Sequence, residues 1–141
     1  MTDEKLIKRV ILHEGMVLKP YKCPAGKLTI GVGRNLEDIG ISQDEALFLL
    51  ENDLNRCHQE CLRSFFWYKD LDTDRQGVIQ EMCFNLGLAR LKTFKKMLRA
   101  CEVGNYELAA HEMLSSRWSA QVGKRAETLA DIMKGKTTCY G

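Results

Sequence analysis

The sequence has little net charge, no low-complexity segment and no long apolar run. Its 21 Lys and Arg residues against 19 Asp and Glu residues leave a net charge of +2, well short of the basic balance typical of dedicated nucleic-acid binders. No apolar run approaches the roughly 18 residues of a membrane-spanning helix. Hydrophobic residues make up 45% of the 141 residues, which excludes a disordered composition. These features favour one folded domain without a membrane anchor.

The N-terminal segment "MTDEKLIKRV" also lacks the apolar region and the cleavage site of a secretory signal peptide. We therefore expect no export by the general secretory route and synthesis in a reducing cytosol. The six cysteines are residues 23, 57, 61, 83, 101 and 139. We interpret all six as thiols, because disulfides are rare in the cytosol and a reduced Cys among apolar helical positions behaves as a small hydrophobe.

Helical periodicity and turn residues divide the N-terminal part of the sequence. Apolar residues recur at helical spacing over residues 3–13, with Thr2 as the candidate N-cap and Gly15 as the end of the helix. Between residues 17 and 32, loosely alternating apolar residues flank the turn-forming "CPAGK". We therefore expect one helix followed by a small hairpin or sheet.

The remaining sequence has a helical pattern. The capping box Ser42-x-x-Glu45 predicts the start of the longest helix, and a second box, Thr73-x-x-Gln76, predicts a helix that ends at Gly87. Three shorter helices are expected within residues 94–104, 106–116 and 123–135.

These elements predict a mostly α-helical α+β fold in a single domain, residues 1–141. A small β lobe is expected over about residues 14–41, and a connecting helix with a helical lobe over about residues 42–141. Clefts between lobes are common ligand sites, so the predicted fold favours a binding or catalytic role.

Glu14, Cys23 and Thr29 are the candidate catalytic residues. A carboxylate at a helix C-terminus, such as Glu14, faces the negative end of the macrodipole, which disfavours the charged form and suits a general acid. Cys23 precedes the turn and Thr29 lies on the next strand, so the hairpin could bring a thiol and a hydroxyl to the same side as the carboxyl group. Taken singly, each residue also has an ordinary structural interpretation: a solvated glutamate, a core cysteine and a threonine favoured in strands.

The arrangement Glu14, eight residues, Cys23, five residues, Thr29 resembles the catalytic signature of the phage-type lysozymes, or endolysins, of glycoside hydrolase family 24. That signature has Asp or Cys at its middle position. The resemblance continues in order and character through "RQGVIQEMCFNLG", "FKKMLRACEVGNYELAAHEMLSSRW" and "KRAETLADIM". It implies a two-lobed, lysozyme-like muramidase that hydrolyses the β-1,4 bond between N-acetylmuramic acid and N-acetylglucosamine in peptidoglycan.

The resemblance also implies roles for individual residues. Glu14 would protonate the leaving glycosidic oxygen, while Cys23 and Thr29 would flank the attacking water in an inverting reaction. A covalent thioglycoside formed by Cys23 is the alternative route. The further residues implied are Asn35, Phe84 and Asn85 for substrate binding and Arg125 as a supporting residue near the catalytic glutamate.

Arg34 follows "GVG" at a position where a histidine can stand in the family. Asp53, on the predicted long helix, is the natural partner for this arginine. We therefore expect a structural ion pair between Arg34 and Asp53.

The same resemblance implies how the protein works in the cell. Peptidoglycan is the expected substrate, and no cofactor or nucleic acid is required. With no export signal, we expect a monomeric enzyme that accumulates in the host cytoplasm and reaches the periplasm and cell wall through a separate holin-type pore. The expected outcome is host cell lysis and phage release.

Two other sequence features suggest different classes of function. Cys57 and Cys61 stand four residues apart beside His58, as metal ligands can, but the sequence has no second CxxC or HxxxH pair. We therefore favour a structural role for this segment and expect no metal. A basic segment could indicate a nucleic-acid or partner-binding module, although such faces are usually solvated or could attract an anionic cell wall. Its residues are Lys92, Lys95, Lys96 and Arg99.

Overall fold

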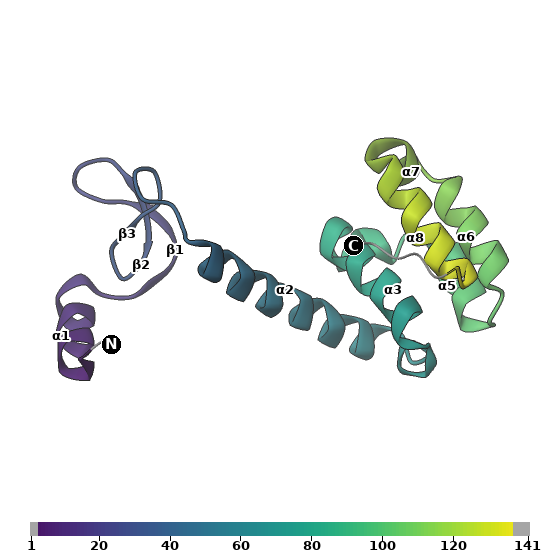
Figure 1. The fold of residues 1–141 in the computed structure, drawn as a ribbon, viewed down its shortest axis with the longest axis horizontal. Coiled ribbons are helices and arrows are strands. Elements are labelled where there is room, and N and C mark those ends of the chain that lie inside the picture. The colour runs from purple at the N-terminus through teal and green to yellow at the C-terminus, as the bar shows by residue number, and fades with distance from the viewer. Residues whose placement is uncertain (1–2, 137–141) are drawn as a thin grey trace. The chain divides into compact units, whose positions relative to one another are not determined.

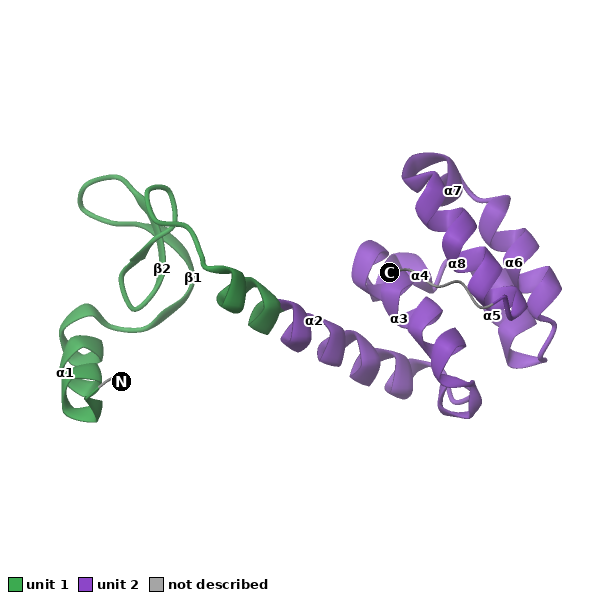
Figure 2. Ribbon diagram, in the orientation of Figure 1, with its two compact units in different colours: residues 1–49 green, residues 50–141 purple. Residues whose placement is uncertain are grey.

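The computed structural model describes residues 3–136. The chain forms two compact units, residues 1–49 and residues 50–141, which are coloured separately in Figure 2. We call them the N-terminal unit and the C-terminal unit. The boundary falls within α2 (Gln43–Ser64), the longest helix. The predicted mostly α-helical α+β class is confirmed.

The N-terminal unit begins with α1 (Glu4–Glu14). The side chain of Asp3 accepts a hydrogen bond from the Lys5 N–H at 2.9 Å and is the N-cap. The predicted cap at Thr2 lies outside the described residues, and Asp3 performs that role. Gly15 ends the helix as predicted, with a φ of 78° that a residue with a side chain rarely adopts.

A three-stranded antiparallel sheet follows, in the order β1 (Val17–Lys22), β2 (Leu28–Gly31), β3 (Arg34–Asn35). This confirms the predicted small sheet (Figure 1). β2 is the central strand, and its Thr29 stands opposite Tyr21 on one side and Asn35 on the other. The loop that joins β1 to β2 closes through a hydrogen bond from the Cys23 N–H to the Lys27 carbonyl at 2.9 Å. Register and loop together place residue 23 near residue 29.

The capping box that opens α2 is present as predicted. The Glu45 N–H donates to the Ser42 hydroxyl at 3.1 Å, and the Ser42 N–H donates to the Glu45 carboxylate at 2.8 Å. Two N–H groups that have no partner within the helix are thereby satisfied.

The C-terminal unit contains the second part of α2, a 3-10 turn η1 (Tyr68–Asp70) and six further helices. These helices are α3 (Thr73–Leu86), α4 (Leu88–Leu91), α5 (Lys95–Glu102), α6 (Tyr106–Leu114), α7 (Arg117–Val122) and α8 (Lys124–Lys134). The predicted capping box at Thr73 is wrong, because Asp72 caps α3 by accepting from the Arg75 N–H at 3.2 Å. Gly87 ends α3 as predicted, whereas the short helices α4 and α7 were not expected.

The hydrophobic core lies in the C-terminal unit, where α8 packs against α3, α6 and α7 and α6 also contacts α5 (Figure 1). Ile79, Met82 and Leu91 are among its fully buried side chains. Arg75 links α3 to α8 and α6. Its Nε donates to the Met133 carbonyl at 2.7 Å, and its guanidinium lies 3.8 Å from the centre of the Tyr106 ring.

All five cysteines within residues 3–136 are free, whereas Cys139 lies outside that range. No helix in the same range has the length and apolar character needed to cross a bilayer.

Candidate active site

Glu14 is the last residue of α1, and its carboxylate lies against the backbone of Gly33 in the turn between β2 and β3. A Cβ at position 33 would stand 3.0 Å from the Glu14 Oε2. Gly33 also has a φ of +71°, so a side chain there would be strained as well as crowded. The glycine therefore allows the turn to approach the carboxylate. Within residues 3–49, no side chain forms a salt bridge with Glu14, which is exposed to solvent.

Cys23 occupies the start of the β1–β2 loop and is partly exposed. The Gly26 N–H donates to the Cys23 carbonyl at 2.7 Å, which tightens the loop around the side chain. The backbone N–H groups of Lys27 and Ala25, together with the Thr29 hydroxyl, form hydrogen bonds that hold the pKa of the Cys23 thiol below its ordinary value, against the opposing effect of partial burial. The loop therefore favours the thiolate more than free solvent would.

Thr29 is the one buried residue among residues 3–49, with 3% of its surface exposed. Its hydroxyl donates to the Lys27 carbonyl at 2.9 Å and also lies within hydrogen-bonding range of the Cys23 thiol. A hydroxyl has one proton to donate, so donation to a Cys23 thiolate would require the bond to Lys27 to be released. The structure therefore brings Cys23 and Thr29 together as the sequence predicted.

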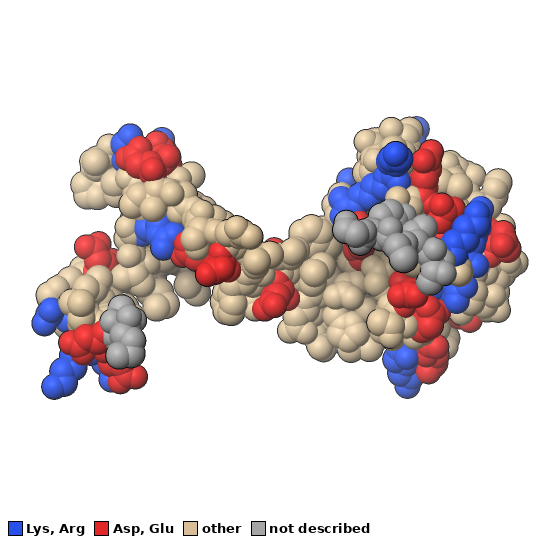
Figure 3. Space-filling model, viewed as in Figure 1, with Lys and Arg blue, Asp and Glu red and all other residues tan. Residues whose placement is uncertain are grey.

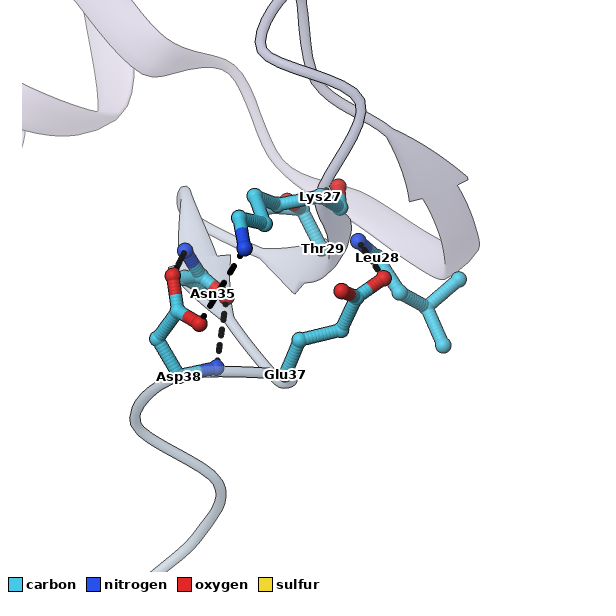
Figure 4. Close-up of polar contacts among 6 residues, drawn as sticks. All are labelled: Lys27, Leu28, Thr29, Asn35, Glu37 and Asp38. Atoms are coloured by element: carbon cyan, nitrogen blue, oxygen red, sulfur yellow. Dashed lines mark hydrogen bonds and ion pairs between the residues drawn. The ribbon is translucent and has the colours of Figure 1, made fainter.

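Charged and amide side chains fix the segment that follows β3 (Figure 4). The Asn35 side-chain NH₂ donates to the Asp38 carboxylate at 3.0 Å, and the Asp38 backbone N–H donates back to the Asn35 side-chain oxygen at 3.0 Å. Lys27 reaches the same carboxylate at 3.4 Å, and the Leu28 N–H donates to Glu37 at 2.9 Å. The contacts of Lys27 and Leu28 fix the start of β2, next to Thr29. In this structure Asn35 is a structural member of the network, and its predicted role in substrate binding stays a prediction.

The predicted pair between Arg34 and Asp53 is wrong. Arg34 binds Glu45 at 2.7 Å and also donates to the Gly40 carbonyl at 3.1 Å, while Asp53 pairs with Arg56 at 2.9 Å. Glu45 stands in the first turn of α2, two turns before Asp53, and so lies closer to the end of β3. The guanidinium also contributes most to holding the pKa of Glu45 at about 2, well below its ordinary range.

Phe84 and Asn85, the predicted saccharide contacts, lie on the last turns of α3 and are both exposed. The indole Nε1 of Trp118 donates to the Asn85 side-chain oxygen at 2.7 Å. This bond fixes the orientation of the amide and leaves its NH₂ group free to donate to a ligand. Trp118 is a residue whose contribution the sequence did not reveal, because it stands 33 positions away along the chain.

Arg125, the predicted supporting residue, is on α8, where its Nε donates to the Glu81 carboxylate of α3 at 2.9 Å. The bond crosses between the same two helices as the Arg75 contact with Met133. Its predicted position near Glu14 stays a prediction. None of the three predicted catalytic residues belongs to the group of possible metal ligands found within residues 3–136, which consists of Cys57, Glu60 and Cys83.

The N-terminal unit thus presents the exposed carboxyl group of Glu14 against the β2–β3 turn, and Cys23 beside Thr29 on the β1–β2 hairpin. The sequence model of the phage lysozyme family matches residues 12–134. Since this match covers nearly the whole described structure, the chain belongs to the phage lysozyme family and is a lysozyme-type hydrolase of glycosidic bonds.

Individual relatives agree with this assignment. The chain is 31% identical to an endolysin of Acyrthosiphon pisum secondary endosymbiont phage 1, over 92% of this chain and 86% of that protein. It is 27% identical to a probable T4-type lysozyme of Dictyostelium discoideum, over 88% and 90% of the two chains. A SAR-endolysin of Haemophilus phage HP1 is 28% identical over 64% of this chain and 50% of that protein.

Proposed function

We propose that this protein is an endolysin that hydrolyses the β-1,4 bond between N-acetylmuramic acid and N-acetylglucosamine in peptidoglycan, causing host cell lysis and phage release. The observation that carries this proposal is the contact between Glu14 and Gly33. Because Gly33 has no side chain, the turn approaches the Glu14 carboxylate closely and leaves it exposed. A carboxyl group in that setting is free to approach a glycosidic oxygen. The paired Cys23 and Thr29 belong to the same unit.

In the proposed reaction, Glu14 is the general acid that protonates the leaving oxygen. Cys23 and Thr29 hold a water molecule on the opposite face of the sugar ring, as an inverting mechanism requires. The backbone N–H groups that lower the pKa of Cys23 increase its thiolate fraction, so the sulfur can accept a hydrogen bond or a proton from that water. No metal or cofactor is required for these steps.

The C-terminal unit would supply contacts to the saccharide. Phe84 offers an exposed aromatic ring, and Asn85 offers an amide oriented by Trp118. Arg125 would support the catalytic glutamate, and Asn35 would bind substrate from the N-terminal unit. The Asn85 arrangement is favourable because a fixed amide loses little conformational freedom on binding.

The test is a turbidity assay on Gram-negative cells with a permeabilised outer membrane. Wild-type protein should clear the suspension, and Glu14→Gln should lower the rate at least ~10²-fold, because an amide cannot donate the required proton. Glu4→Gln is the matched control, since it changes another exposed glutamate of α1 and should remain active. Near-normal lysis by Glu14→Gln, with an unchanged circular dichroism spectrum, would refute the assignment.

The stereochemistry distinguishes the inverting route from a thioglycoside on Cys23. Attack by water opposite the leaving group gives the α-anomer from a β-linked substrate, whereas a covalent intermediate retains the β configuration. Proton NMR of freshly released reducing ends should show mostly α-anomer at early times. A predominance of β-anomer would instead establish the covalent route.

We also propose that the enzyme is a monomer that accumulates in the host cytoplasm and reaches the cell wall through a holin-type pore. Cells that express it alone should stay intact until the inner membrane is permeabilised. The nucleic-acid alternative is less well supported, because Arg99 of the basic segment pairs with Glu102 at 2.6 Å. Acidic and basic side chains are also intermixed on the face shown in Figure 3. Retention of DNA at physiological salt without lysis would favour that alternative.

A further inference from the structure

Three buried cysteines meet where the second part of α2 faces α3. Cys57 and Cys61 stand one turn apart on α2, Cys83 belongs to α3, and their exposed fractions are 3%, 0% and 2%. The sulfur atoms of Cys57 and Cys83 and a carboxylate oxygen of Glu60 all lie within 4.8 Å of one another. Residues from two helices thus place two thiols and a carboxylate around one point.

The surroundings of these thiols provide few other strong partners. The Cys83 thiol lies within hydrogen-bonding range of both Cys57 and Cys61, and thiols form only weak hydrogen bonds with one another. Cys61 and Cys83 are also shielded from solvent, with 0% and 2% of their surfaces exposed. The adjacent His58 is engaged elsewhere, since its Nδ1 lies 2.7 Å from the Tyr68 hydroxyl.

The donor atoms suit a cation of intermediate softness. In tetrahedral zinc sites the metal lies about 2.3 Å from sulfur and 2.0–2.2 Å from oxygen, which separates two sulfur ligands by about 3.8 Å. The donor atoms of Cys57, Glu60 and Cys83 lie within 4.8 Å of one another, so side-chain rotation that draws them together would reach that geometry. Mg²⁺ and Ca²⁺ prefer oxygen ligands and would not select two thiolates.

We propose that Cys57, Glu60 and Cys83 bind one thiophilic divalent cation of the zinc type, with Cys61, which stands outside this group but within hydrogen-bonding range of Cys83, reoriented as the fourth ligand. The metal would displace the thiol protons and link α2 to α3. Glu60 is partly exposed and gives the cation a route from solvent. Arg56 lies close enough to Cys57 and Glu60 to offset part of the negative charge of the ligand set. This inference does not depend on the proposed lytic activity.

The experiment is a titration of the full-length, metal-free chain with Co²⁺, in the presence of a phosphine reductant, followed by displacement with Zn²⁺. Wild-type protein should bind one Co²⁺ with the absorption of a thiolate-coordinated tetrahedral ion, and Zn²⁺ should remove that absorption. Cys83→Ala should weaken Co²⁺ binding at least ~10-fold. Removing a residue that only hydrogen-bonds a metal ligand already lowers metal affinity by about that factor, and removing a ligand should lower it at least as much.

Two further variants separate metal binding from folding. Glu60→Gln keeps the shape of a partly exposed side chain, so it should leave thermal unfolding in a chelator unchanged while weakening Co²⁺ binding at least ~10-fold. Cys101→Ala is the matched control, because Cys101 is a buried cysteine of the same unit that contacts Met97 and Met133 instead. The proposal fails if Co²⁺ gives no thiolate absorption, if Glu60→Gln and Cys83→Ala bind as wild type, or if Cys101→Ala weakens binding equally.

Discussion

The N-terminal unit and the C-terminal unit are held together by different interactions. Every buried hydrophobic residue of the described chain lies between Cys57 and Met133, in the C-terminal unit. Among residues 3–49, Thr29 alone is buried, and the unit is organised by a helix cap, a short sheet, glycine turns and hydrogen bonds such as those of Asn35 and Asp38. Stability is therefore expected to depend on the C-terminal unit.

The candidate catalytic groups lie in the unit without a core of its own. Glu14, Cys23 and Thr29 are positioned by the end of a helix, a tight loop and strand pairing. Glu14 is exposed and Cys23 partly exposed on these segments, whereas groups inside a close-packed core are not accessible. Substitutions in the two units should consequently affect different measurements.

The largest effect is expected from Ile79→Ala. Ile79 is fully buried on α3, and its truncation removes apolar contacts and leaves a cavity, which should lower the free energy of unfolding by ~2–5 kcal/mol. Ile39→Ala, in the N-terminal unit, is the control, because Ile39 is 70% exposed and its loss should change stability by no more than ~0.5 kcal/mol. Urea unfolding monitored by circular dichroism measures both. Equal destabilisation would show that the core is not confined to the C-terminal unit.

Cys23 should show the opposite behaviour, with a large effect on rate and a small effect on stability. Cys23→Ala should lose at least ~10-fold in lytic rate, because the group that holds or deprotonates water is removed. Cys23→Asp should remain active, since a carboxylate can accept the same hydrogen bonds from the backbone N–H groups of Lys27 and Ala25. The measurement is the initial rate of turbidity loss. A Cys23→Ala variant as active as wild type would show that Cys23 takes no part in the reaction.

Two glycines of similar φ test the contact between Glu14 and the β2–β3 turn. Gly31 and Gly33 have φ values of +72° and +71°, but only at Gly33 would a Cβ meet the Glu14 carboxylate. Alanine at either position should cost ~1–2 kcal/mol of stability through backbone strain. Only Gly33→Ala should also reduce the lytic rate, by ~3- to 10-fold, because it displaces the carboxylate. Equal rate losses in the two variants would argue against a specific role for the contact.

The sequence predicted features that depend on neighbouring residues or on the family signature. The Ser42–Glu45 box, the Gly15 and Gly87 helix ends and the small sheet were all correct because the determining residues are close in the chain. The box at Thr73 was wrong because Asp72, one residue earlier, is a better positioned acceptor for the Arg75 N–H.

Contacts between distant segments were harder to predict. The partner of Arg34 depends on where β3 ends relative to the first turn of α2, and no periodicity reveals this. Likewise, the sequence offered Cys57 and Cys61 as a pair without further ligands, because Cys83 joins them only when α2 and α3 pack. The close approach of Gly33 to the Glu14 carboxylate was likewise not predicted, because it depends on how the β2–β3 turn lies against the end of α1.

The smallest expected effect concerns the Arg34–Glu45 pair, which gives the N-terminal unit its own dependence on pH. Hydrogen bonding to Arg34 is the main cause that lowers the Glu45 pKa from 4.5 to about 2. Because the folded pKa is below the unfolded pKa, the stabilisation is fully present above about pH 4.5 and is lost as the pH falls towards 2. The pair is partly exposed, so the effect should be modest and should weaken further at high salt.

Carbon NMR of the Glu45 carboxyl group measures the pKa of Glu45 directly. The titration midpoint should lie near 2 in the wild-type chain and should rise towards the ordinary value of 4.5 in Arg34→Gln. The stability difference between wild type and Glu45→Gln should shrink as the pH falls from about 4.5 to about 2. Asp53→Asn is the control: it breaks the separate Asp53–Arg56 pair and should leave the Glu45 midpoint unchanged. A Glu45 midpoint that stays low in Arg34→Gln would assign the shift to the Ser42 N–H of the capping box instead, and the pair would then contribute nothing to the acid response.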